Sequence, residues 1–189
     1  EVVSVDNSTA GADRDGQVKM FREAALGLAD AAKELRDNMQ EKIARVVEII
    51  NRPENKDDHF LLWHDLEAER EALCKAIPGC KAVYGSQDDD EADRVIADFK
   101  DGRLKYLAAK PEMLGEGLNF QYHCHKAIMF IDYRFNDKFQ AIARIYRFMQ
   151  QHPVELYLVY AESEGEIFKS FMQKWAQHRQ MVAKMTDIV

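Results

Sequence analysis

An alternation of short apolar runs with stretches of helical spacing, repeated from residue 59 onward, constrains this chain more than any other feature. The apolar runs predict strands at residues 60–64, 81–84, 106–109, 127–131 and 154–160. Between and after them, apolar residues recur at threes and fours and predict helices over residues 67–77, 89–99, 137–149 and 165–186. Apolar strands that alternate with helices form parallel sheets covered on both faces, so we predict an α/β fold. Ligands of such sheets bind at the carboxyl ends of the strands, here in the segments after Ala109 and Ile131.

The part of the chain before residue 59 has a different pattern. Residues 1–18 are small and polar and predict a flexible start, whereas residues 19–51 have the spacing of one long amphipathic helix or of two in series. We therefore expect three parts: the start over residues 1–18, a helical segment with its polar linker over 19–58, and the α/β domain over 59–189. The first residue is Glu1 rather than Met, which is typical of a fragment of a longer protein.

Composition and charge exclude several classes of protein. The net charge of −7 argues against a surface coated with basic residues, but residues 101–150 hold eight Lys and Arg against five Asp and Glu, which is compatible with local phosphate contacts. No apolar run approaches the ~20 residues that span a bilayer, and the start lacks a signal-peptide pattern. Three cysteines are too few for a disulfide framework and favour a reducing compartment. We therefore expect a cytoplasmic protein without membrane contacts.

The segment 140–150, Gln-Ala-Ile-Ala-Arg-Ile-Tyr-Arg-Phe-Met-Gln, carries the strongest chemical signal. Arg144 and Arg147 are three residues apart in the expected helix, so their guanidinium groups should project from nearly the same face, with Gln140 one turn earlier. Guanidinium groups stay charged and offer a planar fork of donors, which suits a phosphate that gains charge in a transition state. An ordinary surface helix can also carry two arginines, and the spacing alone leaves both interpretations open.

Three segments, in this order, resemble motifs IV, V and VI in the second RecA-like domain of superfamily 2 helicases, most closely the Swi/Snf-type DNA translocases of bacteria or phages. They are Phe60-Leu-Leu-Trp-His, Lys110-Pro-Glu-Met-Leu-Gly-Glu-Gly-Leu-Asn-Phe, and the stretch from Asp132 to Gln150. The last is similar to the pattern Q-A-x-x-R-x-x-R-x-G-Q, and its matching residues are Gln140, Ala141, Arg144, Arg147 and Gln150. Met149 replaces the usual glycine. The resemblance covers roughly residues 59–175 and implies a RecA-like (P-loop NTPase-like) parallel sheet, preceded by the helical segment.

The resemblance also implies roles for single residues. Arg147 would be an arginine finger and Arg144 its companion, both reaching ATP that a first RecA-like lobe holds. The residues implied in ATP binding are Gln140, Gly117, Arg144 and Arg147. Those implied in contacts to a nucleic-acid backbone, of duplex DNA rather than RNA, are Lys110, Gly115 and Asn119. Simpler interpretations remain open, because Gly115-Glu-Gly117 could be only a turn and Lys110 only a solvated side chain.

The chain lacks the ATP site of a first lobe. It contains no G-x-x-x-x-G-K-[ST] loop, and Gly115-Glu-Gly117 is not followed by the required Lys-Ser/Thr. The literal Asp90-Glu-Ala-Asp follows polar residues instead of an apolar strand, so we interpret it as a solvated helix start and not as a Mg²⁺ ligand. We therefore expect ATP and Mg²⁺ only in the full-length protein, and we expect the chain alone to bind neither and to hydrolyse no ATP.

Two alternatives belong to other classes of function. A non-catalytic RecA-like module would bind a partner protein through its acidic helices, and Arg147 would then be dispensable. A zinc-binding domain would combine His123-Cys-His125 with Cys74 and Cys80. We expect no metal, because no C-x-x-C pair exists and the ligands would come from three separate elements.

Overall fold

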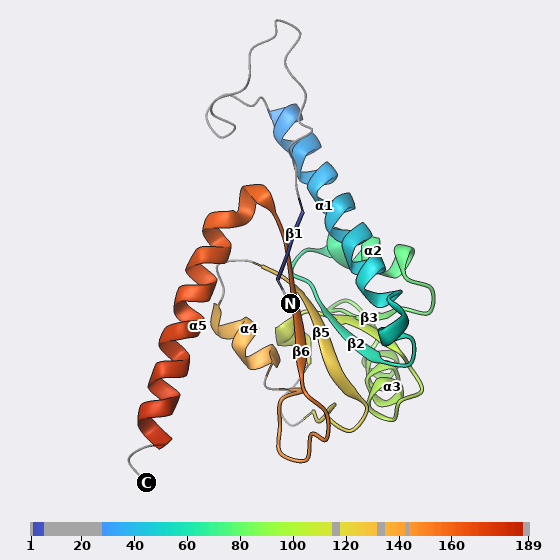
Figure 1. Ribbon diagram of the computed structural model, residues 1–189. Coiled ribbons are helices and arrows are strands. Elements are labelled where there is room, and N and C mark those ends of the chain that lie inside the picture. Colours follow the sequence, from blue (N-terminus) through green and yellow to red (C-terminus); the bar gives the residue numbers. More distant parts are fainter. Residues whose placement is uncertain (1, 6–27, 115–117, 132–134, 143, 187–189) are drawn as a thin grey trace, which may run out of the picture.

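The computed structural model describes residues 2–5, 28–114, 118–131, 135–142 and 144–186 (Figure 1). Its sheet has six parallel strands in the order β1-β6-β5-β2-β4-β3. The strands are β1 (Val2–Val5), β2 (His59–Trp63), β3 (Lys81–Val83), β4 (Tyr106–Ala109), β5 (Cys124–Phe130) and β6 (Glu155–Ala161). The helices are α1 (Leu28–Ile50), α2 (Glu67–Ala76), α3 (Asp89–Lys100), α4 (Phe135–Ile142) and α5 (Gly165–Thr186), with short 3₁₀ helices η1 (Pro53–Asn55), η2 (Pro111–Met113) and η3 (Glu162–Glu164).

The sheet is covered on both faces, as the sequence predicts. Successive residues of a strand point to opposite faces, and the core divides accordingly. Phe60 and Leu62 of β2 pack with α1 and α2, whereas Leu61 and Trp63 pack with apolar residues of α3, α4 and α5. Figure 1 shows α1 and α2 on one side of the sheet and α4 and α5 on the other. The α/β fold class with a helix before the domain is therefore confirmed.

The amino-terminal part differs in one respect from the expected flexible start. Val2–Val5 form β1, which pairs in parallel with β6 from Val2 opposite Leu158 to Val5 opposite Ala161. Valine is a strong strand former, and the outer edge of β6 offers unpaired backbone groups to a further strand. Residues 6–27 lie outside the described part of the chain, so the expected helix is described only from Leu28 onward, as α1.

The register of the central strands places two polar residues together. Trp63 at the end of β2 is opposite Ala109 at the end of β4. The next residues along the two strands, His64 and Lys110, therefore leave the sheet at the same carboxyl edge, and His64 donates its backbone N–H to the carbonyl oxygen of Ala109, 3.3 Å away. This is the edge at which parallel sheets bind their ligands.

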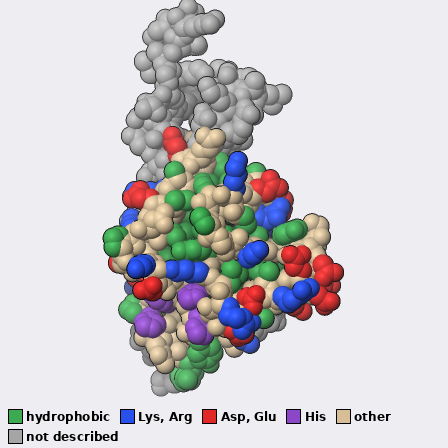
Figure 2. Space-filling view, turned by 90° about the vertical axis from the view of Figure 1, so that its right-hand side faces the viewer, with side chains coloured by type: hydrophobic (Ala, Val, Ile, Leu, Met, Phe, Trp, Pro, Cys, Tyr) green, Lys and Arg blue, Asp and Glu red, His purple; other side chains and the backbone are tan. Residues whose placement is uncertain are grey.

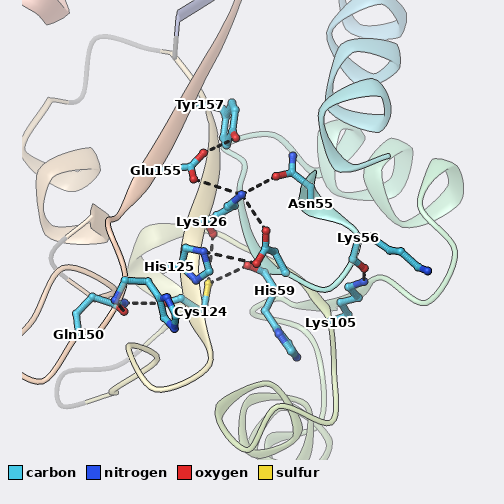
Figure 3. A network of polar contacts seen from close by, with 12 residues as sticks. Asn55, Lys56, His59, Lys105, Cys124, His125, Lys126, Gln150, Glu155 and Tyr157 are labelled. Carbon is cyan, nitrogen blue, oxygen red and sulfur yellow. Dashed lines mark hydrogen bonds and ion pairs between the residues drawn. The ribbon is translucent and has the colours of Figure 1, made fainter. Parts of the chain in front are cut away.

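The opposite, amino-terminal edge is held by a buried lysine (Figure 3). Lys126 of β5 is 5% exposed, and its Nζ lies 2.8 Å from Oδ2 of Asp58, 2.6 Å from Oδ1 of Asn55 and 3.3 Å from Oε1 of Glu155. Burial opposes its charge, but the hydrogen bonds and charges of Asp58 and Glu155 raise the pKa of Lys126 above its usual value. Asn55 also donates to the carbonyl oxygen of Ile49 in α1, 2.6 Å away. The network therefore ties the end of α1 to β5 and β6.

Candidate functional site

The segment that carries the two arginines packs against the loop that follows β4. Arg144 donates from Nη2 to the carbonyl oxygen of Pro111, 3.2 Å away. Arg147 donates from Nη1 to Oδ1 of Asn119. Pro111 follows Lys110 directly, and α4 packs against η2. The fold thus brings two motifs into contact at the carboxyl edge of the sheet. They lie about 30 residues apart in sequence, a spacing typical of one strand–helix repeat.

The two arginines do not lie on a common helix face. The predicted helix over 137–149 is wrong in its second half, because α4 ends at Ile142 and the segment 144–150 forms turns. Ile145 is fully buried, which draws the chain into the core and away from a solvent-exposed helical path. Gln140 does lie in α4, where its side chain is exposed.

The turn segment 144–150 is fixed by two glutamines. The Nε2 of Gln150 donates to the carbonyl oxygens of Ile145 at 3.1 Å and of Cys124 at 3.0 Å. The Nε2 of the buried Gln121 donates to the carbonyl oxygen of Phe148 at 3.4 Å. These bonds anchor the second half of the turn to Gln121 and to the start of β5, on the carboxyl side of Arg147.

Met149 adopts a backbone conformation that glycine favours. Its φ is +73°, and it is the non-glycine residue with positive φ in the part of the chain that the structure describes. This is the position at which the helicase pattern has glycine. A side chain in the left-handed region costs roughly 1–2 kcal/mol. Met149 thus occupies, with a side chain, a backbone conformation that suits the glycine of the pattern.

Lys110 is engaged by an acidic residue at the start of α2. Its Nζ lies 2.9 Å from Oε1 of Glu67, whose other oxygen accepts a hydrogen bond from Nε of Arg70 at 2.8 Å. The hydrogen bond from Lys110, together with the charges of Lys110 and Arg70, lowers the pKa of Glu67 below its usual value. A carboxylate therefore occupies the position at which the Lys110 ammonium could otherwise meet a phosphate oxygen.

His64 is a buried imidazole next to this ion pair. Its side chain is 0% exposed, and neither ring nitrogen has a hydrogen-bond partner among the residues that the structure describes. Burial is the main cause that lowers the pKa of His64 to about 4. The positive charges of Lys110 and Arg70 also lower it, whereas the negative charge of Glu67 raises it. His64 is therefore neutral at pH 7.

Part of the sequence-predicted site lies outside the described residues. Gly115 and Gly117 are in the undescribed segment 115–117, and Asp132 is in the undescribed segment 132–134. Of the remaining site residues, the structure joins Asn119 to Arg147 and connects Arg144 to the carbonyl next to Lys110. Gln140 lies on α4, the helix that packs against η2.

Other polar clusters give no second candidate. Asp90 and Asp93 lie in the first turns of α3, where Asp88 accepts a hydrogen bond from the N–H of Glu91 at 3.2 Å, so the helix-start interpretation is confirmed. The face in Figure 2 shows histidines gathered beside mixed basic and acidic side chains. Cys124 lies at the start of β5, and in the described residues no group of three metal-ligating side chains could hold an ion. No described helix has the length and apolar character to cross a membrane.

Sequence reasoning did not assign roles to Glu67, Gln121 or Gln150. Glu67 reads as an ordinary first-turn acid of α2, where it suits the helix dipole. Gln121 and Gln150 both donate to backbone carbonyls. Gln150 matches the helicase pattern, but the pattern does not show which carbonyls it bonds. The methionine in place of glycine was the one available signal that the turn after Arg147 needs an unusual backbone conformation.

The sequence matches no family model and no curated protein. Among solved structures, the chain is similar to the C-terminal part of the Fun30 ATPase domain, with a TM-score of 0.60 and 16% identity over 69% of this chain and 44% of that one. It is similar to the S. cerevisiae Dbp5 C-terminal domain bound to Gle1 and IP6, with a TM-score of 0.59 and 14% identity over 74% of this chain and 80% of that one.

A third similar structure is the E. coli DEAD-box protein SrmB bound to regulator of ribonuclease activity A, with a TM-score of 0.55 and 16% identity over 71% of this chain and 78% of that one. The chain thus spans less than half of the Fun30 chain that it matches. At these identities the likeness shows the fold alone. It confirms the predicted RecA-like fold, which C-terminal helicase lobes share.

Proposed function

We propose that this chain is the second, C-terminal motor lobe of an ATP-dependent DNA helicase or translocase of superfamily 2. The observation that carries the proposal is the contact between the turn of Arg144 and Arg147 and the loop of Lys110 and Asn119. A motor of this kind needs an element that senses nucleotide and an element that grips a nucleic-acid backbone, and the two must be mechanically connected. Here they share two side-chain hydrogen bonds.

The guanidinium groups suit the nucleotide part of this role. Arg147 is exposed, and Arg144 is half-buried beside the carbonyl of Pro111. Their donors fit phosphate oxygens, and their positive charge is independent of pH in the physiological range. The triphosphate, with Mg²⁺ to neutralise its charge, would be held by a first RecA-like lobe. Arg147 would then stabilise charge on the transferred phosphoryl group, with Arg144 and Gln140 at the same cleft, and Gly117 would line it.

The loop after β4 suits the nucleic-acid part. Lys110 would pair with a backbone phosphate, Asn119 would donate from its amide, and Gly115 would let the backbone approach. Such contacts carry little sequence information and weaken with salt. When Arg147 turns toward nucleotide, it would release Asn119, and the grip of the loop would change with the nucleotide state.

A non-catalytic RecA-like module for a partner protein is the second candidate. It is favoured by the exposed aromatic side chains of the arginine turn, since Phe148 is 90% and Tyr146 is 73% exposed. Exposed aromatic residues are frequent anchors of protein interfaces. In the motor proposal, the same two aromatic side chains would face the first lobe.

The test is ATP turnover by the complete protein, with this lobe and its Walker A lobe together, with and without duplex DNA, single-stranded DNA and RNA. Turnover that duplex DNA stimulates supports the proposal. If only RNA stimulates turnover, the motor acts on RNA instead of DNA. Absence of turnover with every nucleic acid, from a preparation that binds ATP, would support the non-catalytic module instead.

A further inference from the structure

Two cysteines lie side by side away from the arginine turn. Cys74 is in the last turn of α2 and Cys80 directly precedes β3, and their Sγ atoms are 3.9 Å apart. The chain between them makes a Pro-Gly turn, in which Cys80 donates its N–H to the carbonyl oxygen of Ile77 at 3.1 Å and Gly79 has a φ of +80°. A disulfide bond is ~2.05 Å long, so the sulfur atoms need to approach by about 1.9 Å to form one.

The two thiols are chemically unequal. The thiol hydrogen bond with Cys80 and the charges of Arg70 and Lys81 lower the pKa of the half-buried Cys74 to about 7, against the effect of burial. The same hydrogen bond and burial raise the pKa of Cys80. At neutral pH a large share of Cys74 is therefore thiolate while Cys80 keeps its proton, which is the arrangement of an attacking and a resolving cysteine.

We propose that Cys74 and Cys80 are a peroxide-oxidised pair that forms a reversible disulfide within the chain. The Cys74 thiolate attacks one oxygen of hydrogen peroxide, the O–O bond breaks, and hydroxide leaves and is protonated by solvent. The sulfur of Cys80 then attacks the sulfenic sulfur, the S–S bond forms, the S–O bond breaks, and water leaves with the thiol proton. Two thiols are oxidised and one peroxide is reduced to water, and a thiol reductant reverses the change.

The third cysteine provides a contrast within the same molecule. Cys124 is buried in β5, and its thiol donates to the carbonyl oxygen of Lys126 at 3.2 Å. Burial raises the pKa of Cys124 to about 12, so the thiol stays protonated. The disulfide also leaves the proposed motor residues untouched. Cys74 lies seven residues along α2 from Glu67, about 10 Å at the helical rise.

The test maps the oxidised cysteines in the purified protein. The reduced protein is treated with hydrogen peroxide, remaining thiols are blocked with iodoacetamide, and the unreduced protein is digested with trypsin. Cleavage after Arg70, Lys75 and Lys81 separates the two cysteines, so their disulfide joins peptides 71–75 and 76–81. We expect this linked pair, the loss of two of the three thiols, a yield that does not change on dilution, and full recovery with dithiothreitol.

Matched variants separate this pair from general oxidation. Cys74→Ser and Cys80→Ser should abolish the linked peptides, and Cys124→Ser should leave their yield unchanged. The wild-type map decides the question even where a serine variant fails to fold. Oxidation that stops at a sulfinic acid on Cys74, or that yields only disulfides between chains whose amount rises with protein concentration, overturns the proposal.

Discussion

At the scale of single residues, the chemistry of the site depends on partners that lie far away in sequence. The sequence pattern identified Arg144, Arg147, Lys110 and Asn119, because their residue types and spacing match a known series of motifs. It could not show that Glu67 neutralises Lys110, since an acid in the first turn of a helix is common on any surface. It also could not show that His64 is buried without partners, because a histidine at a strand end is compatible with many environments.

Glu67 should restrain nucleic-acid binding. In Glu67→Gln the ion pair with Lys110 is lost, and the freed ammonium can neutralise one more phosphate. We expect severalfold tighter binding of duplex DNA at low salt and a slope of log K against log salt that is steeper by about 1. Fluorescence anisotropy at several salt concentrations measures the affinity and the slope.

Glu166→Gln is the control, because it removes an exposed acid paired with Lys169 on α5, and it should change neither the affinity nor the slope. An affinity for Glu67→Gln no higher than that of this control would contradict the proposed competition.

His64 should make the folded state sensitive to acid. The pKa of His64 is lowered to about 4 in the folded chain from 6.5, so the unfolded chain binds more protons between these values. The free energy of unfolding should therefore be fully supported above pH 6.5 and fall by up to about 3 kcal/mol as the pH drops to 4. Urea unfolding across this range measures the slope.

The slope assigned to His64 can be isolated by substitution. His64→Leu has no titrating group at this position and should lose that part of the pH dependence, whereas His123→Leu at an exposed position should keep it. Parallel pH profiles of wild type and His64→Leu would show that His64 does not carry the effect.

At the scale of elements, the sequence predicted each strand of the domain and most helix boundaries to within a few residues. The exception is α4, which ends at Ile142 instead of near residue 149. Helical spacing continues through Ile145 in the sequence, but burial of that side chain and the carbonyl contacts of Gln121 and Gln150 favour a turn. Tertiary contacts of this kind override local periodicity, and a single sequence does not reveal them.

The turn after Arg147 should be stabilised by glycine. Met149→Gly removes a side chain from a backbone with φ +73°, and relief of that conformation should exceed the extra entropy of the unfolded chain. We expect a gain of about 0.5–1 kcal/mol in the free energy of unfolding, with an unchanged dependence on urea concentration. Met149→Ala controls for the lost side chain and should be less stable than Met149→Gly by about 1 kcal/mol. Equal stabilities of the two variants would show that no strain is stored there.

The lysine network should be essential for joining α1 to the sheet. Lys126→Met leaves the buried Oδ1 of Asn55 and the carboxylate of Asp58 without their ammonium partner. Removing one member of a buried ion pair costs roughly 3–5 kcal/mol, and denaturant unfolding should report a loss in that range. Lys169→Met, at an ion pair exposed on α5, should leave the free energy of unfolding nearly unchanged. A loss for Lys126→Met as small as that of the control would mean that the network contributes only packing.

At the scale of the whole molecule, the parallel sheet with helices on both faces followed from the sequence, because alternating apolar strands and helices have few other stable arrangements. The pairing of β1 with β6 did not follow from the sequence. A short valine-rich segment that precedes the domain by more than 50 residues gives no indication of the strand with which it pairs. In the proposed function, Arg147 acts on ATP that a first RecA-like lobe holds. This role can therefore be measured only in the complete protein.

The most direct measurement is steady-state ATP hydrolysis by the complete protein, saturated with duplex DNA, for wild type, Arg147→Ala, Arg147→Lys and Arg94→Ala. Arg94 is exposed on α3 and donates within its own helix, so Arg94→Ala is the matched loss of a surface arginine. We expect kcat to fall about 10³-fold or more in Arg147→Ala, to retain at most part of the wild-type value in Arg147→Lys, and to be unchanged in Arg94→Ala. A kcat for Arg147→Ala within about twofold of the wild-type value, from a folded protein, would contradict the role proposed for Arg147.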